Sequence, residues 1–176
     1  MKKIYKKKIS KIGILGGTFD PPHKGHVYIS KIGIQKLKLE KMIWLITKKN
    51  PLKNKPFLSI KKRIQLSKKI TSKNRKISVQ YIDGKIKSSY TFDFLKYIKK
   101  KNPNTKLYFL MGSDNLTKFH TWFNWRRIPK MARIVVFPRG KYLKKSIATK
   151  KLNKKDFIHI NCKKINISSS LIRKFC

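Results

Sequence analysis

The sequence predicts an α/β protein built on a doubly wound parallel sheet with helices on both faces. Short apolar runs alternate with amphipathic stretches along the chain, and turn-forming residues separate them. Strands that alternate with helices imply right-handed crossovers, which build a parallel sheet. The length of 176 residues suits one substantial core. We therefore expect a single domain over residues 1–176, with residues 1–10 as a flexible basic lead-in.

The first half of the chain predicts three strands and two helices. The expected strands are short apolar runs at residues 11–15, 42–47 and 77–82. The first helix covers residues 26–37, and its predicted inward face is formed by Val27, Ile29, Ile34 and Leu37. A loop rich in Pro, Lys and Asn at residues 48–57 precedes the second helix, which Ser59 can cap and which runs to about Ile70.

The second half continues the same alternation. A third helix is expected from Thr91, whose hydroxyl suits an N-cap, to the stop at Asn102 and Pro103. Its predicted buried residues are Phe92, Leu95 and Ile98. Further strands are expected at residues 106–111, 133–137 and 157–160, with a helical piece at 122–131 and a final helix from about residue 169. The whole pattern is Rossmann-like, so ligands should bind outside the carboxyl ends of the strands, where the strand order reverses.

The net charge of +41 raises the possibility of a polyanionic partner. The lysines are spread along the whole chain beside abundant Ile and Asn, whose codons are also AT-rich, so base composition of the genome explains the charge. We expect no specific nucleic-acid partner. No apolar stretch approaches the roughly 20 residues that span a bilayer, and residues 1–11 do not resemble a secretory signal. Cys162 and Cys176 form no metal-ligand spacing and read as reduced thiols. We expect a cytoplasmic protein with no membrane partner.

The loop after the first expected strand is the best candidate for binding phosphates. Gly16 and Gly17 let the backbone approach a ligand and present N–H groups to an anion. His23 and His26 are three residues apart at a helix entrance, where both imidazoles can donate to phosphate oxygens. A plain Gly-Gly turn, or a zinc pair completed by Asp20, are the alternatives.

Two segments at opposite ends of the chain carry a resemblance to a known family. Residues 16–26 resemble the H-x-G-H signature of the nucleotidyltransferase superfamily, and residues 167–173 resemble its I-S-S-T-x-I-R signature, with Ser170 in place of the usual threonine. The resemblance implies that His26 contacts the α-phosphate and that His23 lies along the triphosphate, as catalytic residues. It further implies an ATP and phosphate site formed by Gly16, Gly17, Thr18, Phe19, His23, His26, Ser169, Ser170 and Arg173.

Three further segments resemble the bacterial nicotinate mononucleotide adenylyltransferases. Residues 89–95 resemble an S-Y-T-x-x-T-L motif, with Phe94 in place of threonine. Residues 112–128 resemble a G-x-D-x-L-x-x-F-x-x-W-x-x-[WY]-x-x-I block, and residues 50–53 occupy the place of the loop after the second strand. The mononucleotide site that we assign on this basis comprises Tyr90, Thr91, Asp114, Trp122, Lys53 and Arg139.

Each of these roles has a chemical rationale. Trp122 offers a flat apolar face to a pyridine ring, the N–H groups of Tyr90 and Thr91 at a helix start can receive a carboxylate, and Asp114 can accept from ribose hydroxyls. Core packing is the alternative for the aromatic row, and Trp125 in particular is expected to remain in the core. His120 and His159 match no motif position and receive no role.

The resemblance implies transfer of AMP from ATP to nicotinate mononucleotide, with Mg²⁺ on the triphosphate and no dedicated protein metal site. Nicotinamide mononucleotide or phosphopantetheine as acceptor remain alternatives, as does, more distantly, a basic nucleic-acid-binding protein. The oligomeric state stays open.

Overall fold

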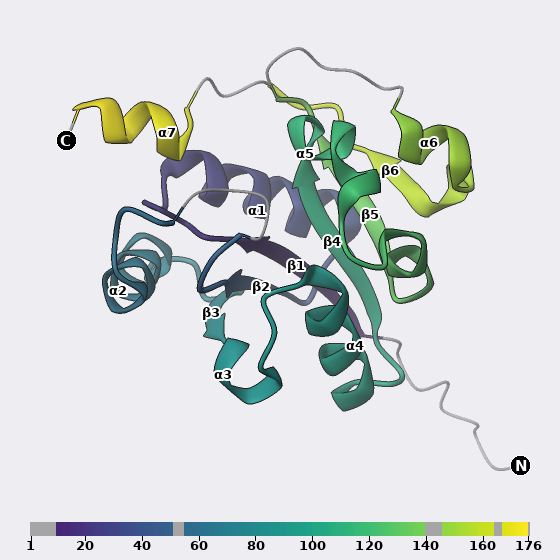
Figure 1. The fold of residues 1–176 in the computed structure, drawn as a ribbon, viewed down its shortest axis with the longest axis horizontal. Helices are drawn as coiled ribbons and strands as arrows, with labels where there is room; N and C mark the ends of the chain where they lie inside the picture. The colour runs from purple at the N-terminus through teal and green to yellow at the C-terminus, as the bar shows by residue number, and fades with distance from the viewer. Residues whose placement is uncertain (1–9, 51–54, 140–145, 164–166, 176) are drawn as a thin grey trace, which may run out of the picture.

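Six parallel strands form one sheet in the order β3-β2-β1-β4-β5-β6 (Figure 1). The computed structural model describes residues 10–50, 55–139, 146–163 and 167–175. Most of the predicted lead-in and Lys53 therefore lie outside the described residues. The strands are β1 (Lys11–Gly17), β2 (Lys41–Ile46), β3 (Ile77–Tyr81), β4 (Lys106–Gly112), β5 (Ala132–Phe137) and β6 (Phe157–His159).

The strand order reverses at the centre of the sheet. β1 pairs with β2 on one side and with β4 on the other. Chain order runs outward to β3 in one direction and to β6 in the other. This is the predicted doubly wound, Rossmann-like topology, and its switch point lies between the carboxyl ends of β1 and β4.

Helices cover both faces of the sheet, as Figure 1 shows for α1 and α4. The α-helices are α1 (Lys24–Leu37), α2 (Ile60–Thr71), α3 (Asp83–Ile86), α4 (Thr91–Lys101), α5 (Ser113–Thr117), α6 (Ile147–Lys151) and α7 (Ser169–Ile172). The 3₁₀ turns are η1 (Phe119–Thr121), η2 (Trp125–Lys130), η3 (Lys154–Asp156) and η4 (Arg173–Phe175). Alternate residues of β1, β2, β4, β5 and β6 enter two separate apolar cores, because successive side chains of a strand point to opposite faces, whereas β3 contributes to only one of them.

Most expected elements are present, with differences that have local causes. β1 continues to Gly17 because Gly16 and Gly17 still pair with β2. The predicted N-cap at Thr91 is wrong, since Tyr90 occupies that position and Thr91 is the first residue of α4. The helical piece expected at 122–131 is shorter, because Asn124 adopts a left-handed conformation (φ 52°) between η1 and η2. The short helices α3, α5 and α6 were not predicted.

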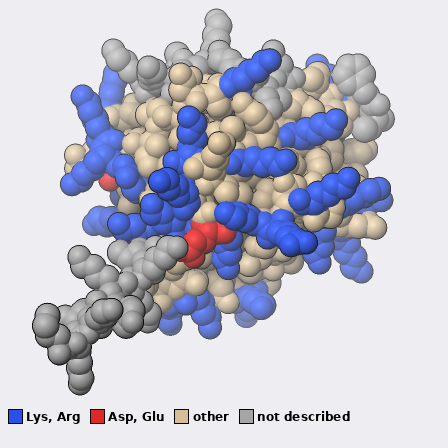
Figure 2. Space-filling model, turned by 180° about the vertical axis from the view of Figure 1, so that it is seen from behind, with Lys and Arg blue, Asp and Glu red and all other residues tan. Residues whose placement is uncertain are grey.

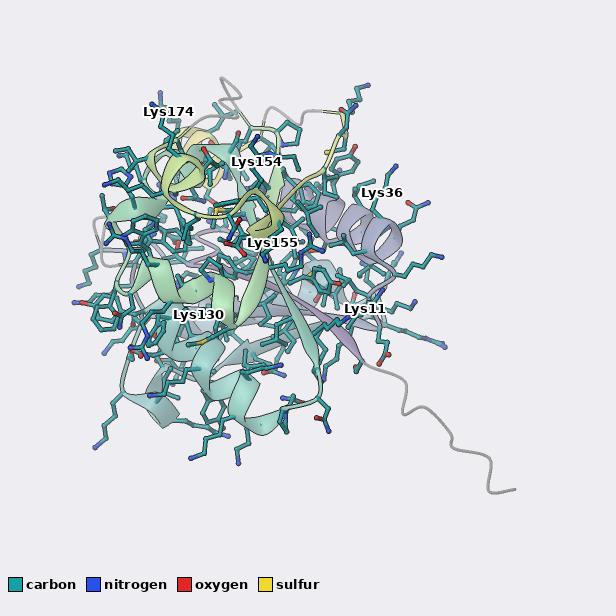
Figure 3. All side chains as sticks on the ribbon, turned by 90° about the vertical axis from the view of Figure 1, so that its right-hand side faces the viewer. Lys11, Lys36, Lys130, Lys154, Lys155 and Lys174 are labelled. Atoms are coloured by element: carbon teal, nitrogen blue, oxygen red, sulfur yellow. The ribbon has the colours of Figure 1, made fainter. Side chains whose placement is uncertain are left out.

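Basic side chains cover the surface widely. Figure 2 shows Lys and Arg spread over one whole face, with few acidic residues among them. Figure 3 shows basic side chains on several separate elements, labelled Lys11, Lys36, Lys130, Lys154, Lys155 and Lys174. This scatter agrees with a compositional origin of the charge. Within the described part of the chain, no helix is long and apolar enough to cross a membrane.

Candidate active site

A cavity of about 610 Å³ opens at the carboxyl ends of β1 and β4, where the sheet topology predicts a ligand. Most of the residues proposed from the sequence line it. These are Gly16, Gly17, Thr18, Phe19, His26, Tyr90, Thr91, Trp122, Arg139, Ser169, Ser170 and Arg173. His23 and Asp114 are not part of this lining but contact residues that are: the buried His23 stacks on His26, and the exposed Asp114 pairs with Arg139.

The two histidines form a stacked pair at the start of α1. Their ring centroids are 3.8 Å apart, and the backbone N–H of His23 donates to Nδ1 of His26 at 3.2 Å. In the neutral imidazole an accepting Nδ1 leaves the hydrogen on Nε2. His26 therefore presents Nε2 as a hydrogen-bond donor at the cavity.

Both histidines are held neutral. Burial lowers the pKa of His26 well below 6.5, and electrostatic interaction with His23 and Arg139 lowers it further. Burial, with Arg139, lowers the pKa of His23 to about 4. The buried Nδ1 and Nε2 of His23 have no hydrogen-bond partner in the described structure. Because buried polar atoms are normally paired, an orphaned imidazole beside a cavity favours a ligand contact.

An aromatic stack supports His26 from below. The Phe19 ring stacks on Trp44, with centroids 4.8 Å apart. The Phe19 ring also contacts the His26 ring, at the same centroid distance of 4.8 Å. The indole Nε1 of Trp44 donates to Ser30 Oγ at 2.8 Å, and Ser30 Oγ donates to the His26 carbonyl at 2.8 Å. Ser30 and Trp44 are fully buried. The imidazole is therefore fixed through both its ring and its backbone.

The two signature segments dock directly on one another. Ser169 Oγ donates to the carbonyl of Pro21 at 2.8 Å. The guanidinium of Arg173 donates to the carbonyl of Asp20 and lies 3.6 Å from its carboxylate. A Cβ at Gly25 would come within 2.9 Å of both the His23 ring and Ile167. The glycine between the two histidines is thus explained by close approach of the C-terminal segment.

The aromatic row divides between core and cavity. Phe119 is fully buried and packs edge-on against both Trp122 and Trp125. Trp122 is half-buried, rests on Phe109 and lines the cavity, so its ring is available to a ligand. Trp125 packs against the core and stays outside the cavity lining, as predicted.

The segment before α4 is only partly as expected. The N–H of Tyr90, predicted to receive a carboxylate, donates to Ser88 Oγ at 3.1 Å. The N–H of Thr91 lies in the first turn of α4, where the helix itself offers no acceptor. Thr91 is therefore the stronger donor candidate of the two.

Arg139 lies nearer to the histidines than its assignment to the mononucleotide suggested. Its charge acts on the pKa of both His23 and His26. It pairs with Asp114 at 3.5 Å, and Ser113 Oγ bonds both its backbone N–H and its carbonyl. The Arg139 guanidinium is therefore paired with Asp114, and Arg139 belongs to the same cavity lining as His26.

Sequence reasoning missed two buried charged residues next to the cavity, Arg63 and Asp83, and gave the buried Asp20 no role beyond that of a possible zinc ligand. Asp20 and Asp83 belong to only six acidic residues in the chain, and that rarity is the signal that could have singled them out. Arg63 carries no comparable signal among 47 basic residues.

Several known proteins resemble this chain along most of its length. Residues 14–175 match the family model described as cytidylyltransferase-like. A probable nicotinate-nucleotide adenylyltransferase of Pelagibacter ubique is 46% identical over 170 residues, which cover 95% of this chain and 94% of that protein. A protein of the same name from a Ruegeria species is 38% identical over 128 residues, covering 73% and 67%.

Solved structures give the same answer. The nicotinic acid mononucleotide adenylyltransferase of Plasmodium falciparum, complexed with NaAD, superposes with a TM-score of 0.76 at 25% identity, covering 94% of this chain and 83% of that one. Its complex with APC superposes with a TM-score of 0.77 at the same identity and coverage. The chain belongs to the cytidylyltransferase-like family and, within it, to the nicotinate-nucleotide adenylyltransferases.

Proposed function

We propose that this protein transfers AMP from ATP to nicotinate mononucleotide, giving nicotinate adenine dinucleotide and pyrophosphate for NAD biosynthesis. The observation that carries this function is the meeting of the two signature segments, through Ser169 and Arg173, at the cavity that contains His26. The relatives and solved neighbours bear the name of the same activity.

The reaction needs positioning and charge stabilisation. A 5′-phosphate oxygen of the mononucleotide attacks the α-phosphorus of ATP in line. The bond from that phosphorus to the oxygen bridging to the β-phosphate breaks, and pyrophosphate leaves. The neutral His26 donates from Nε2 to an α-phosphate oxygen, where negative charge grows in the transition state. Ser169, Ser170 and Arg173 hold the triphosphate with hydroxyl and guanidinium donors.

Trp122 and the first turn of α4 supply the acceptor end of the site. The indole offers a face to the pyridine ring, and the Thr91 N–H offers a donor to its carboxylate. The half-buried position of Trp122 at the cavity favours a flat aromatic acceptor over phosphopantetheine.

We propose that Mg²⁺ enters with ATP and is held mainly by phosphates and water. In the described residues no three His, Cys, Asp or Glu side chains gather to hold a metal ion. Both Asp20 oxygens already accept backbone hydrogen bonds, and Asp114 pairs with Arg139. Because these carboxylates already have protein partners, a Mg²⁺ ion at this site would keep most of its water ligands and neutralise the charge of the triphosphate. We further propose that the protein acts in the cytoplasm.

A pyrophosphate-release assay with ATP and a panel of acceptors tests this function. Nicotinate mononucleotide should give the highest kcat/KM, ahead of nicotinamide mononucleotide, with phosphopantetheine inactive. Faster turnover of phosphopantetheine would refute the assignment. In parallel, duplex and single-stranded RNA should bind only at low salt, because the affinity of nonspecific electrostatic binding falls steeply as the salt concentration rises.

A further inference from the structure

Two of the six acidic residues are buried close together beside the cavity. Asp20 is 5% exposed and Asp83 is 6% exposed. A buried carboxylate costs free energy unless it is paired and hydrogen-bonded. The partners of these two residues therefore indicate what each one does.

Arg63 of α2 is the cation that both carboxylates face. It is 2% exposed, and its guanidinium donates four hydrogen bonds of 2.7 to 3.0 Å to the backbone carbonyls of Thr18, Thr47, Lys48 and Leu58. Burial lowers the pKa of Arg63, whereas the negative charges of Asp20 and Asp83 raise it. Arg63 thus ties the loop after β1 to both ends of the segment between β2 and α2.

Asp83 extends this network to the segment before α4. Its Oδ2 accepts from the backbone N–H of Lys48 at 2.8 Å and from Ser89 Oγ at 2.7 Å. Ser89 lines the cavity directly before Tyr90 and Thr91, whereas Asp83 does not line it. Asp83 therefore lies behind the cavity wall, and it holds this wall in position through its hydrogen bond with Ser89.

Asp20 serves the other side of the cavity. Its two oxygens accept from the N–H groups of Phe57 and Leu58 at 2.7 and 2.8 Å. Its carbonyl and carboxylate also contact Arg173, which we assign to the triphosphate. Both buried carboxylates thus interact with Arg63, but Asp20 supports the side of the cavity formed by Arg173, and Asp83 supports the side formed by Ser89.

We propose, on the basis of the function proposed above, that Asp83 is a positioning residue for the mononucleotide. Its hydrogen bonds to Lys48 and Ser89 hold the start of α4 at a fixed distance from the segment between β2 and α2. That distance sets the width of the part of the cavity that receives the pyridine ring. Arg63 provides a positive charge close to this buried carboxyl group. A shift of the wall by about 1 Å is enough to reduce catalysis strongly.

The test is a comparison of the KM values for the two substrates in Asp83→Asn. The amide keeps the size of the side chain but replaces charge-assisted hydrogen bonds by weaker neutral ones. We expect the KM for nicotinate mononucleotide to rise about tenfold, while the KM for ATP stays within about twofold of wild type. A merely structural loss of stability would lower the active fraction and leave both KM values unchanged.

Glu40→Gln is the matched control. It also removes one negative charge, but Glu40 is exposed, precedes β2 at the end of the strand opposite the cavity, and accepts only from Ser10 Oγ. Wild-type KM values are expected. If Glu40→Gln and Asp83→Asn raised the acceptor KM equally, net charge would explain the effect and the role of Asp83 would be refuted.

Ser89→Ala and the double variant test whether Asp83 acts through Ser89. Removal of one hydroxyl at the cavity leaves no buried charge unpaired, so Ser89→Ala should fold even if Asp83→Asn does not. We expect a selective rise in the acceptor KM, and a double variant whose effect is smaller than the product of the single effects. An unchanged acceptor KM in Ser89→Ala, or single effects that multiply fully, would overturn the proposal.

The design separates this inference from the proposed function. If the wild-type protein used another acceptor, the proposed function would fail, and the same KM comparison with that acceptor would decide the role of Asp83. Quenching of tryptophan fluorescence on titration with nicotinate mononucleotide gives a second readout, because Trp122 lines the cavity. The Kd for the mononucleotide should rise in Asp83→Asn by about the same factor as KM, and an unchanged Kd counts against the proposal.

Discussion

The imidazole rings of His23 and His26 stack with their centroids 3.8 Å apart, although only one of them lines the cavity. The backbone N–H of His23 also fixes the tautomer of His26, so the first histidine contributes through its main chain as well as its ring. The spacing of the two residues in the signature therefore builds one local unit that holds the His26 ring in a fixed position at the cavity.

Replacing His26 by Ala should lower kcat far more than it weakens ATP binding. The loss of one preorganised donor to a developing oxyanion typically costs about 10²- to 10³-fold in rate. Steady-state kinetics with saturating substrates measure the effect. His120→Ala is the control, because His120 lies outside the cavity lining. A folded His26→Ala protein with wild-type kcat would remove His26 from the reaction.

The activity should be insensitive to pH near 6.5, where an ordinary histidine titrates. Burial, His23 and Arg139 lower the pKa of His26, so the neutral donor persists well below that pH. We expect kcat to stay level from about pH 8 to about pH 6. Loss of half the activity at pH 6.5, with an unchanged KM, would show that His26 titrates normally.

His23 should make the protein less stable in acid. Its pKa is about 4 in the folded state against the ordinary value of 6.5, so the unfolded chain binds more protons between these pH values. The stability it contributes is full above pH 6.5 and falls as the pH drops toward about 4. Urea midpoints at pH 7 and pH 5 should show this fall, and His23→Asn should reduce it. An identical fall in both proteins would contradict the assignment.

Replacing Arg173 by Ala should raise the KM for ATP strongly. In the proposed mechanism the guanidinium binds the triphosphate already in the ground state, and in the structure it ties the C-terminal segment to Asp20. Arg133→Ala removes an exposed arginine near the start of β5, at the end of the strand opposite the cavity, and serves as the control. A change confined to the KM for the mononucleotide would show that Arg173 binds the acceptor and not ATP.

The enzyme should prefer nicotinate over nicotinamide mononucleotide. A hydrogen bond to a charged group is worth roughly 1.5–3 kcal/mol against about 1 for a neutral one, so donors at the start of α4 can discriminate by about tenfold to a few hundredfold. Thr91→Pro should reduce this ratio of kcat/KM values, because it deletes the N–H while proline is tolerated as the first residue of a helix. Equal kcat/KM for the two mononucleotides would indicate dual specificity.

Ser30→Ala should destabilise the fold and disturb His26. The buried indole N–H of Trp44 would lose its acceptor, which typically costs about 1–3 kcal/mol in the free energy of unfolding. Chemical denaturation measures the loss. Ser72→Ala is the control, because its hydroxyl is exposed and donates only to the carbonyl of Lys69 at the end of α2.

The sequence by itself determined the order of strands and helices, the two buried faces of the sheet and part of the cavity lining. Apolar periodicity sets which residues face the core, and parallel strands bring their carboxyl ends to one edge, so His26 and Trp122 could be placed from local patterns. The resemblance of two short segments supplied their chemical roles.

Only the tertiary structure decided the contacts that hold these residues in place. Arg63 and Asp83 bind mainly backbone groups that are distant in the chain, such as Thr18 for Arg63 and Lys48 for Asp83. A backbone carbonyl or N–H looks the same at every position, so such a partner leaves no mark in the sequence. The hydrogen bond from the Tyr90 N–H to Ser88 Oγ was not predicted. Side chains such as Ser can bind a nearby backbone group or cap a helix, and small differences in the torsion angles decide between the two. These differences are settled only when the segment packs against the rest of the fold.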